Sequence, residues 1–380
     1  MKRILAIALC LLLLPVCAFA QETTVDEQTD AVFRKFKTTG GAVVVYRDGE
    51  LAYERYYGVK NKNARTAVDE NTYFRLASVT KMVSGIGAMQ LVERGALSLD
   101  APIGDALGFE VINPYAPEIP VTLRMLMTHT AAFRENGGFA SQSRTLSSIL
   151  GDRDKRWGNF EKRASGSKYV YSNFGAGTVG AMMEAVTGQS VNAYMQENVF
   201  APLGIDAAYA PSLLASPDDV ASLYTAKGKL FKAASAYLRE TYEDTADPER
   251  HYRTTIGALW MRPRDLARVT QALCGDGTVN GVRLLQAETV ELMRADQTGV
   301  GDVYSDEYGL FVKRVPNLLD GKMVYGHQGT SEGIVCNAYY IPEENFVFVL
   351  MTNGTSSARN DGIMNIARQM FALMHAEFGA

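Results

Sequence analysis

Apolar strand pairs at both ends of the chain constrain its fold more than any other feature. Residues 41–57 predict a hairpin, because two apolar runs flank a turn containing Asp48 and Gly49, and Asp-Gly in that position is a strong hairpin signal. Residues 334–341 and 346–351 predict two more strands around a proline-containing turn. Both ends of the chain are therefore expected to supply one sheet. A last helix is expected at 361–378, with its apolar residues on one face.

The middle of the chain has a different character. From about residue 97 to 258 the apolar spacing is mostly helical, interrupted by a loop at 135–143 and a polar stretch at 240–253. The sequence predicts an α/β (α+β) fold, in which residues 21–96 and 259–380 form an antiparallel sheet flanked by helices. Residues 97–258 form an inserted, mainly helical domain. We expect an active site where the two domains meet.

The first twenty residues are typical of a secretory signal peptide. A basic start, Met1-Lys2-Arg3, precedes an apolar run at 4–14 and a small-residue cleavage site ending at Ala20. The run is too short for a transmembrane helix, which needs about 20 apolar residues. Lipidation at Cys17 is disfavoured by the bulky Val16 before it. We expect cleavage after Ala20, no membrane span thereafter, and a periplasmic or extracellular protein.

Composition excludes several functional classes. The net charge is −4 and we find no long basic run, which gives no support for nucleic-acid binding. The four histidines form no spaced cluster with each other or with cysteine, so we expect no metal site. His129 is expected to be a structural histidine at the domain junction. After signal cleavage Cys274 and Cys336 remain, and a disulfide and two buried free thiols both stay open.

The segment Ser78-Val79-Thr80-Lys81 places a hydroxyl and an amine three positions apart at the start of an apolar helix that stops at Gly95. Residues three apart share a helix face, so Lys81 can take the proton of Ser78 if burial keeps its amine neutral. The helix N-terminus favours negative charge developing beside the serine. The same spacing in Ser165-Gly166-Ser167-Lys168 lies among glycine and serine and predicts a loop.

Tyr171-Ser172-Asn173 is a second candidate motif. Tyrosine is a plausible proton shuttle if a nearby lysine stabilises its phenolate, because its ordinary pKa of about 10 makes it a poor base at neutral pH. Asn173 offers both an acceptor and donors. The alternative is a simple turn, since serine and asparagine prefer turns and tyrosine fills space.

His327-Gln328-Gly329 is a third candidate motif, just ahead of the strand at 334–341. Glycine lets a substrate lie close against the backbone, and the N–H of Thr330 can then point into a cleft. The alternative is a surface histidine in a glycine-rich turn.

Residues 175–180 match the Gly-x-Gly-x-x-Gly dinucleotide fingerprint. The preceding stretch, 165–173, is polar where a buried parallel strand should be apolar, and no surrounding β-α-β unit is visible. Small residues on a tightly packed helix explain the pattern better.

The three motifs together, in this order, resemble the serine beta-lactamase and penicillin-recognising family, especially its class C branch with the D-Ala-D-Ala carboxypeptidases and related esterases. The resemblance covers essentially the whole mature chain. It implies that Ser78 attacks a carbonyl and that Lys81 and Tyr171 relay its proton. Asn173 orients the substrate, and the backbone N–H groups of Ser78 and Thr330 hold the oxyanion. No metal or organic cofactor is required.

His327 is a departure from the class C beta-lactamases that the chain resembles, because they usually carry lysine there. Histidine has an ordinary pKa of about 6.5 and is mostly neutral at pH 7. His327 and Gly329 are expected to bind the substrate. The hold of His327 on a beta-lactam carboxylate should be weaker than that of lysine, and activity on carboxylate-bearing substrates should vary with pH near the histidine titration. Peptide or ester hydrolysis is therefore favoured over efficient beta-lactam hydrolysis.

Three functions are compatible with these motifs. The first is an exported serine hydrolase acting on D-Ala-type peptides, beta-lactams or small esters, with the peptidoglycan stem peptide among the candidate substrates. The second is a carboxylesterase with little peptide activity, and the third is a sensor that is acylated at Ser78 without turnover. Glu332, which follows the third motif, adds the hypothesis of a carboxylate that binds a substrate ammonium group; a solvated loop charge is the alternative.

Overall fold

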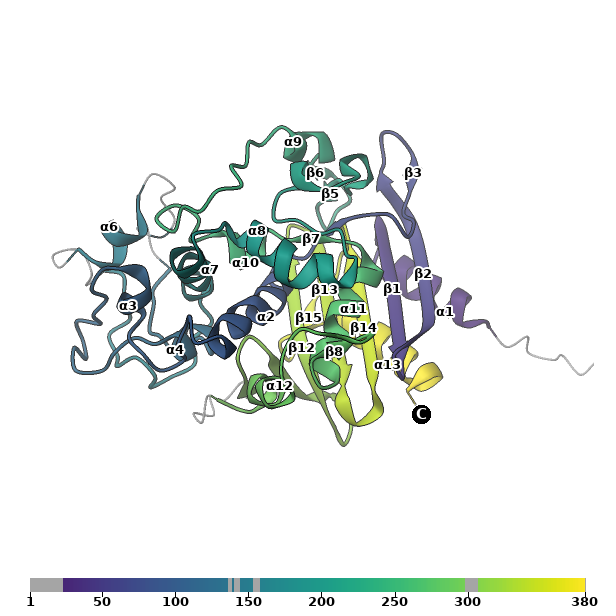
Figure 1. The fold of residues 1–380 in the computed structure, drawn as a ribbon. Coiled ribbons are helices and arrows are strands. Elements are labelled where there is room, and N and C mark those ends of the chain that lie inside the picture. Colours follow the sequence, from purple (N-terminus) through teal and green to yellow (C-terminus); the bar gives the residue numbers. More distant parts are fainter. Residues whose placement is uncertain (1–22, 136–138, 140–143, 153–157, 298–306, 380) are drawn as a thin grey trace, which may run out of the picture.

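The computed structural model describes residues 23–135, 139, 144–152, 158–297 and 307–379, so the expected signal peptide at 1–20 lies outside the described residues. Eight described strands form one antiparallel sheet in the order β10-β11-β12-β13-β14-β1-β2-β3 (Figure 1). The strands are β1 (Gly40–Arg47), β2 (Glu50–Asn61), β3 (Thr66–Ala67), β10 (Glu307–Tyr308), β11 (Lys313–Leu319), β12 (Lys322–Ser331), β13 (Ile334–Ile341) and β14 (Phe346–Thr352).

The expected hairpin and the two late strands are confirmed, and they meet at the centre of the sheet. β1 pairs with β2 on one side and with β14 on the other, so the first and last strands of the sheet-forming sequence lie side by side. Side chains alternate between the two faces of a strand. Val43 and Val45 accordingly belong to the apolar cluster on one face, and Ala42 and Val44 to the cluster on the other.

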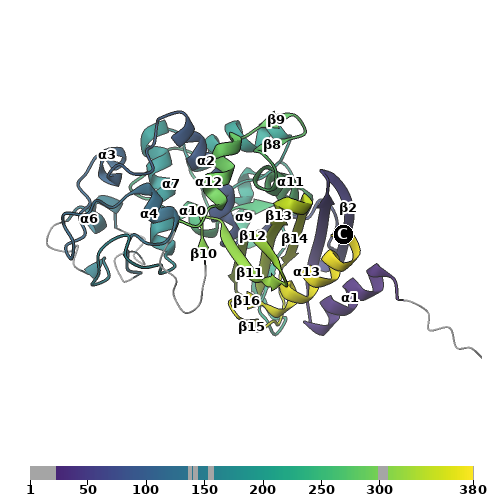
Figure 2. The same ribbon diagram turned by 90° about the horizontal axis from the view of Figure 1, so that it is seen from below.

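Helices cover both faces of the sheet (Figures 1 and 2). One face packs against α1 (Val25–Lys35) and α13 (Asn365–Phe378), which also contact each other. The expected last helix is therefore confirmed, although it begins at Asn365. The other face packs against α11 (Pro263–Cys274) and α2 (Val79–Glu93).

The middle of the chain packs around α7 (Asn173–Thr187). α2 contacts both α7 and the sheet strands β12 and β13, so its N-terminus lies where the helical segment meets the sheet. Other described elements are α3 (Ile103–Leu107), α4 (Leu123–Met127), α6 (Leu146–Leu150), α8 (Val191–Met195), α9 (Ala234–Leu238), α10 (Thr254–Gly257), α12 (Ala287–Arg294), β4 (Phe74–Arg75), β5 (Leu223–Tyr224), β6 (Leu230–Lys232), β7 (Trp260–Met261), β8 (Thr278–Val279), β9 (Val282–Arg283), β15 (Arg359–Asn360) and β16 (Ile363–Met364).

Regular helix does not extend through the whole of 97–258. After α8 the chain forms a five-residue π-helix, Gln196–Phe200, and then short 3-10 turns and the small hairpin of β5 and β6. Prolines begin the 3-10 turns at Pro211 and Pro217, where the missing N–H and fixed φ favour a turn start. The stretch 165–168 has no helix or strand, as its glycine and serine content predicts.

Cys274 and Cys336 are free and buried, which resolves the two alternatives in favour of thiols. Burial raises the pKa of Cys274 to about 12, so its thiol stays protonated. None of the helices in the described ranges has the length and apolarity needed to cross a membrane.

The glycine-rich pattern at 175–180 is explained by helix packing. An added Cβ at Gly177 would lie 1.8 Å from the carbonyl oxygen of Tyr252, and one at Gly180 would lie 2.8 Å from the Thr255 side chain. These glycines let α7 pack closely against Tyr252 and against α10, which follows it. At Gly175, in the same helix, the nearest atom would be 3.6 Å away, an ordinary contact.

Gly177→Ala should therefore destabilise the protein by about 2–3 kcal/mol, because overpacking outweighs the gain in helix propensity. Gly175→Ala is the matched control and should leave the free energy of unfolding nearly unchanged or raise it. Urea unfolding followed by circular dichroism measures both. Equal stability of the two variants would contradict the close approach at Gly177.

Candidate active site

Backbone pairing holds the segment just before the nucleophile candidate Ser78. β4 pairs with β7, and Leu76 donates its N–H to the carbonyl of Leu259 at 2.9 Å. Ala77 then adopts φ 46°, a left-handed conformation that is strained for a side-chain-bearing residue. Ser78 is the N-cap of α2, whose helical residues begin at Val79. The hydroxyl is therefore placed at a sharp strand-to-helix turn, beside the positive end of the helix dipole.

Lys81 lies one turn along α2 and is completely buried. Its Nζ lies 3.1 Å from Ser78 Oγ, 2.9 Å from Asn173 Oδ1 and 2.8 Å from the carbonyl oxygen of Ile256. Burial lowers the pKa of Lys81 to about 7, while the carboxylate of Glu135 opposes the shift. A substantial fraction of the amine is therefore neutral at pH 7.

The three neighbours orient the neutral amine. An uncharged amine has two N–H bonds and one lone pair. Asn173 Oδ1 and the Ile256 carbonyl oxygen accept the two N–H bonds, since neither atom can donate. The lone pair then points to the remaining neighbour, Ser78 Oγ, where it can accept the hydroxyl proton. In the fraction of molecules in which burial leaves the lysine neutral, Lys81 can therefore act as the base for Ser78.

Tyr171 lies beside this pair. Its ring centroid is 5.0 Å from Lys81 Nζ, and its hydroxyl group interacts with the Ser78 side chain. Burial of the hydroxyl raises the pKa of Tyr171 above its ordinary value of 10, although the side chain as a whole is 38% exposed. The phenol is therefore protonated in the free protein. The structure favours Lys81 as the base, and it does not support a Tyr171 phenolate.

His129 positions the tyrosine. It is buried, its Nδ1 accepts the backbone N–H of Ser172 at 3.2 Å, and its ring lies 4.4 Å from that of Tyr171. Burial holds the pKa of His129 well below its ordinary value, and so the ring is neutral. This agrees with a structural role. Its Nε2 has no hydrogen-bond partner among the described residues.

Asn173 and Glu135 form a contact that the sequence alone did not reveal. Glu135 accepts the backbone N–H groups of Asn173 and Phe174 at the start of α7, and its Oε2 accepts Asn173 Nδ2 at 3.3 Å. The contact fixes the amide so that Oδ1 faces Lys81. The sequence marked 135–143 only as a loop; an acidic residue able to reach a helix N-terminus was the available signal.

The prediction that His327 titrates near neutral pH is wrong. The ring is buried, and burial together with the charges of Lys81 and Lys313 lowers its pKa to about 3. Its Nδ1 lies 2.7 Å from the carbonyl oxygen of Gln328 and its Nε2 lies 2.7 Å from the hydroxyl of Tyr308. Nδ1 therefore carries the proton, and Nε2 accepts from Tyr308. His327 lines the cavity as a neutral, hydrogen-bonded ring.

Gly329 lets β12 approach the nucleophile. An added Cβ would lie 2.3 Å from the carbonyl oxygen of Leu76 and 2.8 Å from the backbone nitrogen of Ser78. The next residue, Thr330, has an exposed side chain whose Oγ1 accepts Arg359 Nη2 at 3.1 Å. This places the backbone at 329–330 next to that of Ser78, the arrangement that two oxyanion donors require. Their role as an oxyanion hole stays a prediction.

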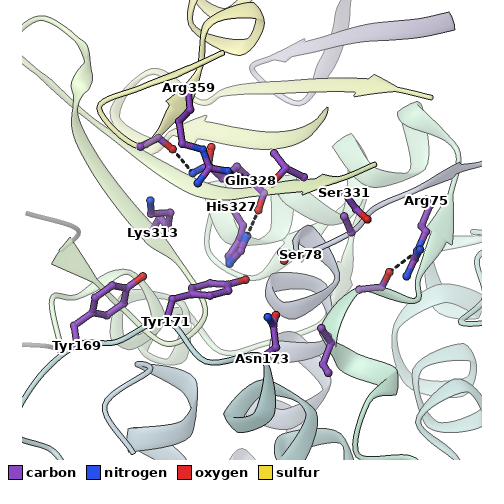
Figure 3. A pocket seen from close by; sticks show the side chains of 15 residues that line it. Arg75, Ser78, Tyr169, Tyr171, Asn173, Lys313, His327, Gln328, Ser331 and Arg359 are labelled. Atoms are coloured by element: carbon purple, nitrogen blue, oxygen red, sulfur yellow. Dashed lines mark hydrogen bonds between the residues drawn. The ribbon is translucent and has the colours of Figure 1, made fainter. Parts of the chain in front are cut away.

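These groups surround a cavity of about 500 Å³ that opens beside Ser78 (Figure 3). The described lining includes Ser78, Tyr171, Asn173, His327 and Thr330, together with three basic side chains that sequence reasoning missed, Arg75, Lys313 and Arg359. These three come from separate strands and have no common motif spacing, so only the fold could bring them together. No carboxylate is among the lining residues that the structure describes.

Glu332 is not among those lining residues. It lies with φ 43° in the exposed turn between β12 and β13. The hypothesis of an ammonium-binding carboxylate receives no support from this placement. A search of the described residues for groups of three or more histidine, cysteine, aspartate or glutamate side chains able to hold a metal ion found none.

Glu135→Gln tests the contact at α7. Loss of the carboxylate removes a charge that raises the pKa of Lys81, so the pH at which kcat/KM reaches half its plateau should move down. The rate on the plateau should fall about tenfold, because the amide of Asn173 loses its charged acceptor.

Glu288→Gln, on the exposed surface of α12, is the control and should change neither quantity. A pH–rate profile of each variant measures both effects. An unshifted midpoint in Glu135→Gln would contradict the electrostatic link to Lys81.

The chain is similar to known proteins over most of its length. A family model described as Beta-lactamase matches residues 29–371. The D-alanyl-D-alanine-carboxypeptidase/endopeptidase AmpH of Escherichia coli (strain K12) is 28% identical over 365 residues, covering 91% of this chain and 88% of that protein. Esterase EstB of Burkholderia gladioli is 32% identical over 193 residues, which cover 47% of this chain and 49% of that protein.

Among solved structures, a D-amino acid amidase from Ochrobactrum anthropi SV3 has the same fold, with a TM-score of 0.69 and 19% identity. The match covers 93% of this chain and 98% of that one.

Proposed function

The chain belongs to the beta-lactamase family and is a serine hydrolase of its class C-like branch, and we propose that it is an exported enzyme that hydrolyses peptides ending in D-alanine. The observation that carries the proposal is the buried Lys81 amine, 3.1 Å from Ser78 Oγ and neutral in part at pH 7. An amine in that state can deprotonate a serine as it attacks a carbonyl.

In the proposed reaction Ser78 Oγ bonds to the carbonyl carbon while its proton passes to Lys81 Nζ. The backbone N–H groups of Ser78 and Thr330 hold the oxyanion. As the C–N bond breaks, the Tyr171 hydroxyl protonates the leaving amine and is itself reprotonated by the Lys81 ammonium group. Water then attacks the acyl-enzyme and returns Ser78 to its hydroxyl form.

The charge of the cavity supports a carboxylate on the leaving group. Tyr171 is the proposed proton donor, so the leaving group should lie on its side of Ser78. Lys313 lies on that side, and Arg359 borders the cavity above it (Figure 3). Both cations can attract the terminal carboxylate of a D-alanine leaving group. They would supply the fixed charge that the neutral His327 lacks.

Small esters are the second candidate substrate class. The relative EstB is named an esterase, and an ester carbonyl needs the same nucleophile and oxyanion donors as a peptide. Beta-lactams come third, because His327 stands where class C beta-lactamases carry lysine. Export is proposed from the basic, apolar and small-residue segments of residues 1–20.

Ser78→Ala is the direct test. We expect purified wild type to hydrolyse a D-Ala-D-Ala peptide faster than p-nitrophenyl butyrate or nitrocefin. Ser78→Ala should lose activity on all three by about 10⁶-fold in kcat, as when a nucleophile is removed from a serine hydrolase. Full activity in Ser78→Ala would mean that the nucleophile is misassigned.

The same panel separates the other functions. Hydrolysis of the butyrate ester alone would support the carboxylesterase. A labelled penicillin that remains attached to Ser78 for hours, with no turnover of any substrate, would support the sensor.

Lys313→Met tests the leaving-group charge. The variant should lower kcat/KM for a D-Ala-D-Ala peptide about tenfold, the usual scale for a lost charge-assisted hydrogen bond. For the same peptide with a C-terminal amide the loss should be much smaller. Equal losses on the two peptides would contradict a role in carboxylate binding.

A further inference from the structure

A second cavity of about 440 Å³ adjoins the first, outside the catalytic groups. The two cavities share Arg75, Ile256 and Gly257 in their walls. The second is completed by Arg250, Tyr252, Arg253 and Ala258. A ligand bound in the first cavity beside Arg75 therefore lies next to the second cavity.

The second cavity is strongly basic. Three of its lining side chains are arginines, and none of its described lining residues is acidic. Within the described ranges, no ion pair involves Arg75 or Arg253. Arg250 has only a loose pair with Asp247, at 3.9 Å between two substantially exposed side chains. Such a pair contributes little. Arg75 also lines a neighbouring pocket together with Glu240, so Arg250 and Arg253 carry the least compensated charge.

Local contacts hold two of these arginines in place. Arg75 donates through Nε to the carbonyl oxygen of Gly257 at 2.9 Å, and its guanidinium group also interacts with Tyr237. The remaining N–H bonds can serve a ligand. The Arg253 guanidinium lies over the ring of Phe139, 5.4 Å from its centroid. Ordered guanidinium groups lose less conformational entropy when they bind a carboxylate.

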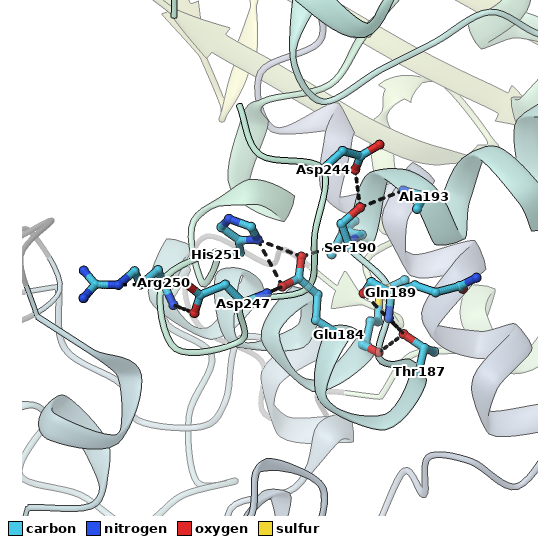
Figure 4. A network of polar contacts seen from close by, with 11 residues as sticks. Glu184, Thr187, Gln189, Ser190, Ala193, Asp244, Asp247, Arg250 and His251 are labelled. Carbon is cyan, nitrogen blue, oxygen red and sulfur yellow. Dashed lines mark hydrogen bonds and ion pairs between the residues drawn. The ribbon is translucent and has the colours of Figure 1, made fainter. Parts of the chain in front are cut away.

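The chain segment that carries Arg250 is anchored to α7 through Glu184 (Figure 4). The buried carboxylate of Glu184 accepts the backbone N–H of Asp247 at 2.7 Å and lies 3.1 Å from His251 Nδ1. The C-terminal end of the polar stretch 240–253 is therefore held in place, and it forms one wall of the second cavity.

The position of the second cavity assigns it to the acyl part of the substrate. Tyr171, Tyr169 and Lys313 lie on one side of Ser78, and Arg75 and Ser331 lie on the opposite side (Figure 3). The leaving group belongs beside its proton donor, Tyr171. The acyl chain must then extend toward Arg75, and from there toward Arg250 and Arg253.

We propose that Arg75, Arg250 and Arg253 form an acyl-side subsite for a carboxylate, so that the preferred substrates carry a second negative charge in the acyl part. The inference rests on the proposed acyl-enzyme chemistry at Ser78. Arginine suits this role because its planar N–H groups bind a carboxylate in a bidentate manner.

The test uses matched pairs of D-alanyl thiobenzyl esters. One member is acylated on nitrogen with a dicarboxylic acid of four to eight carbons, and the other with the corresponding monoamide. The leaving group is the same in both, so the ratio of their kcat/KM values reports the acyl side alone. We expect wild type to prefer the best carboxylate about tenfold over its amide, and the preference should fall as salt is added.

The double variant Arg250→Gln/Arg253→Gln should bring this ratio close to one. Arg34→Gln, on the exposed surface of α1 and remote from both cavities, is the matched control and should keep the wild-type ratio. A wild-type ratio near one for every chain length would overturn the subsite, and so would a double variant that retains the preference. In either case loss of hydrolysis in Ser78→Ala would leave the proposed function standing.

Binding provides a readout that does not need turnover. Calorimetry with Ser78→Ala should give a Kd about tenfold lower for the carboxylate than for its amide. Equal affinities would overturn the subsite even if the thiobenzyl esters prove not to be substrates.

Discussion

The burial of one amine determines what this fold can do chemically. Lys81 is enclosed between its own helix α2, α7 and α10, and its neighbours include one hydroxyl and two oxygen acceptors. Removal from water disfavours its charged form, and Asn173 and Ile256 fix the direction of its lone pair. Without this enclosure the lysine would be an ordinary ammonium group, and Ser78 an ordinary helix-capping serine.

Much of the remaining architecture maintains that enclosure. The sheet brings β12 against the backbone of Ser78, which requires glycine at 329. The glycines of α7 let it approach the chain at Tyr252 and Thr255, just before Ile256. Glu135 orients the amide of Asn173 at the N-terminus of α7. Each contact comes from a different part of the sequence, and each limits how far the amine can move.

Local patterns predicted what depends on local interactions. The Asp48-Gly49 hairpin, the strands at 334–341 and 346–351, and the helix after Ser78 follow from apolar spacing and turn chemistry within a few residues. The spacing of Ser78 and Lys81 gave their contact, because i and i+3 share a helix face. The last helix begins at Asn365 and not at 361 as predicted, because residues 361–364 form a turn and a short strand before it.

Properties that depend on surroundings could not be predicted in this way. A pKa is set by burial and by charges distant in sequence, so the ordinary value for histidine misled the interpretation of His327. Lys313, Arg359, Arg250 and Arg253 have no shared motif, and only the fold brings them to adjoining cavities.

The central claim concerns the charge of Lys81, and its most direct test is a titration of that amine. In protein labelled with ¹³C at lysine Cε, the Lys81 signal can be assigned by its loss in Lys81→Arg. We expect the midpoint of the Lys81 titration near 7, because burial lowers the pKa of this amine to about 7. A midpoint near the ordinary lysine value of about 10.4 would contradict this claim.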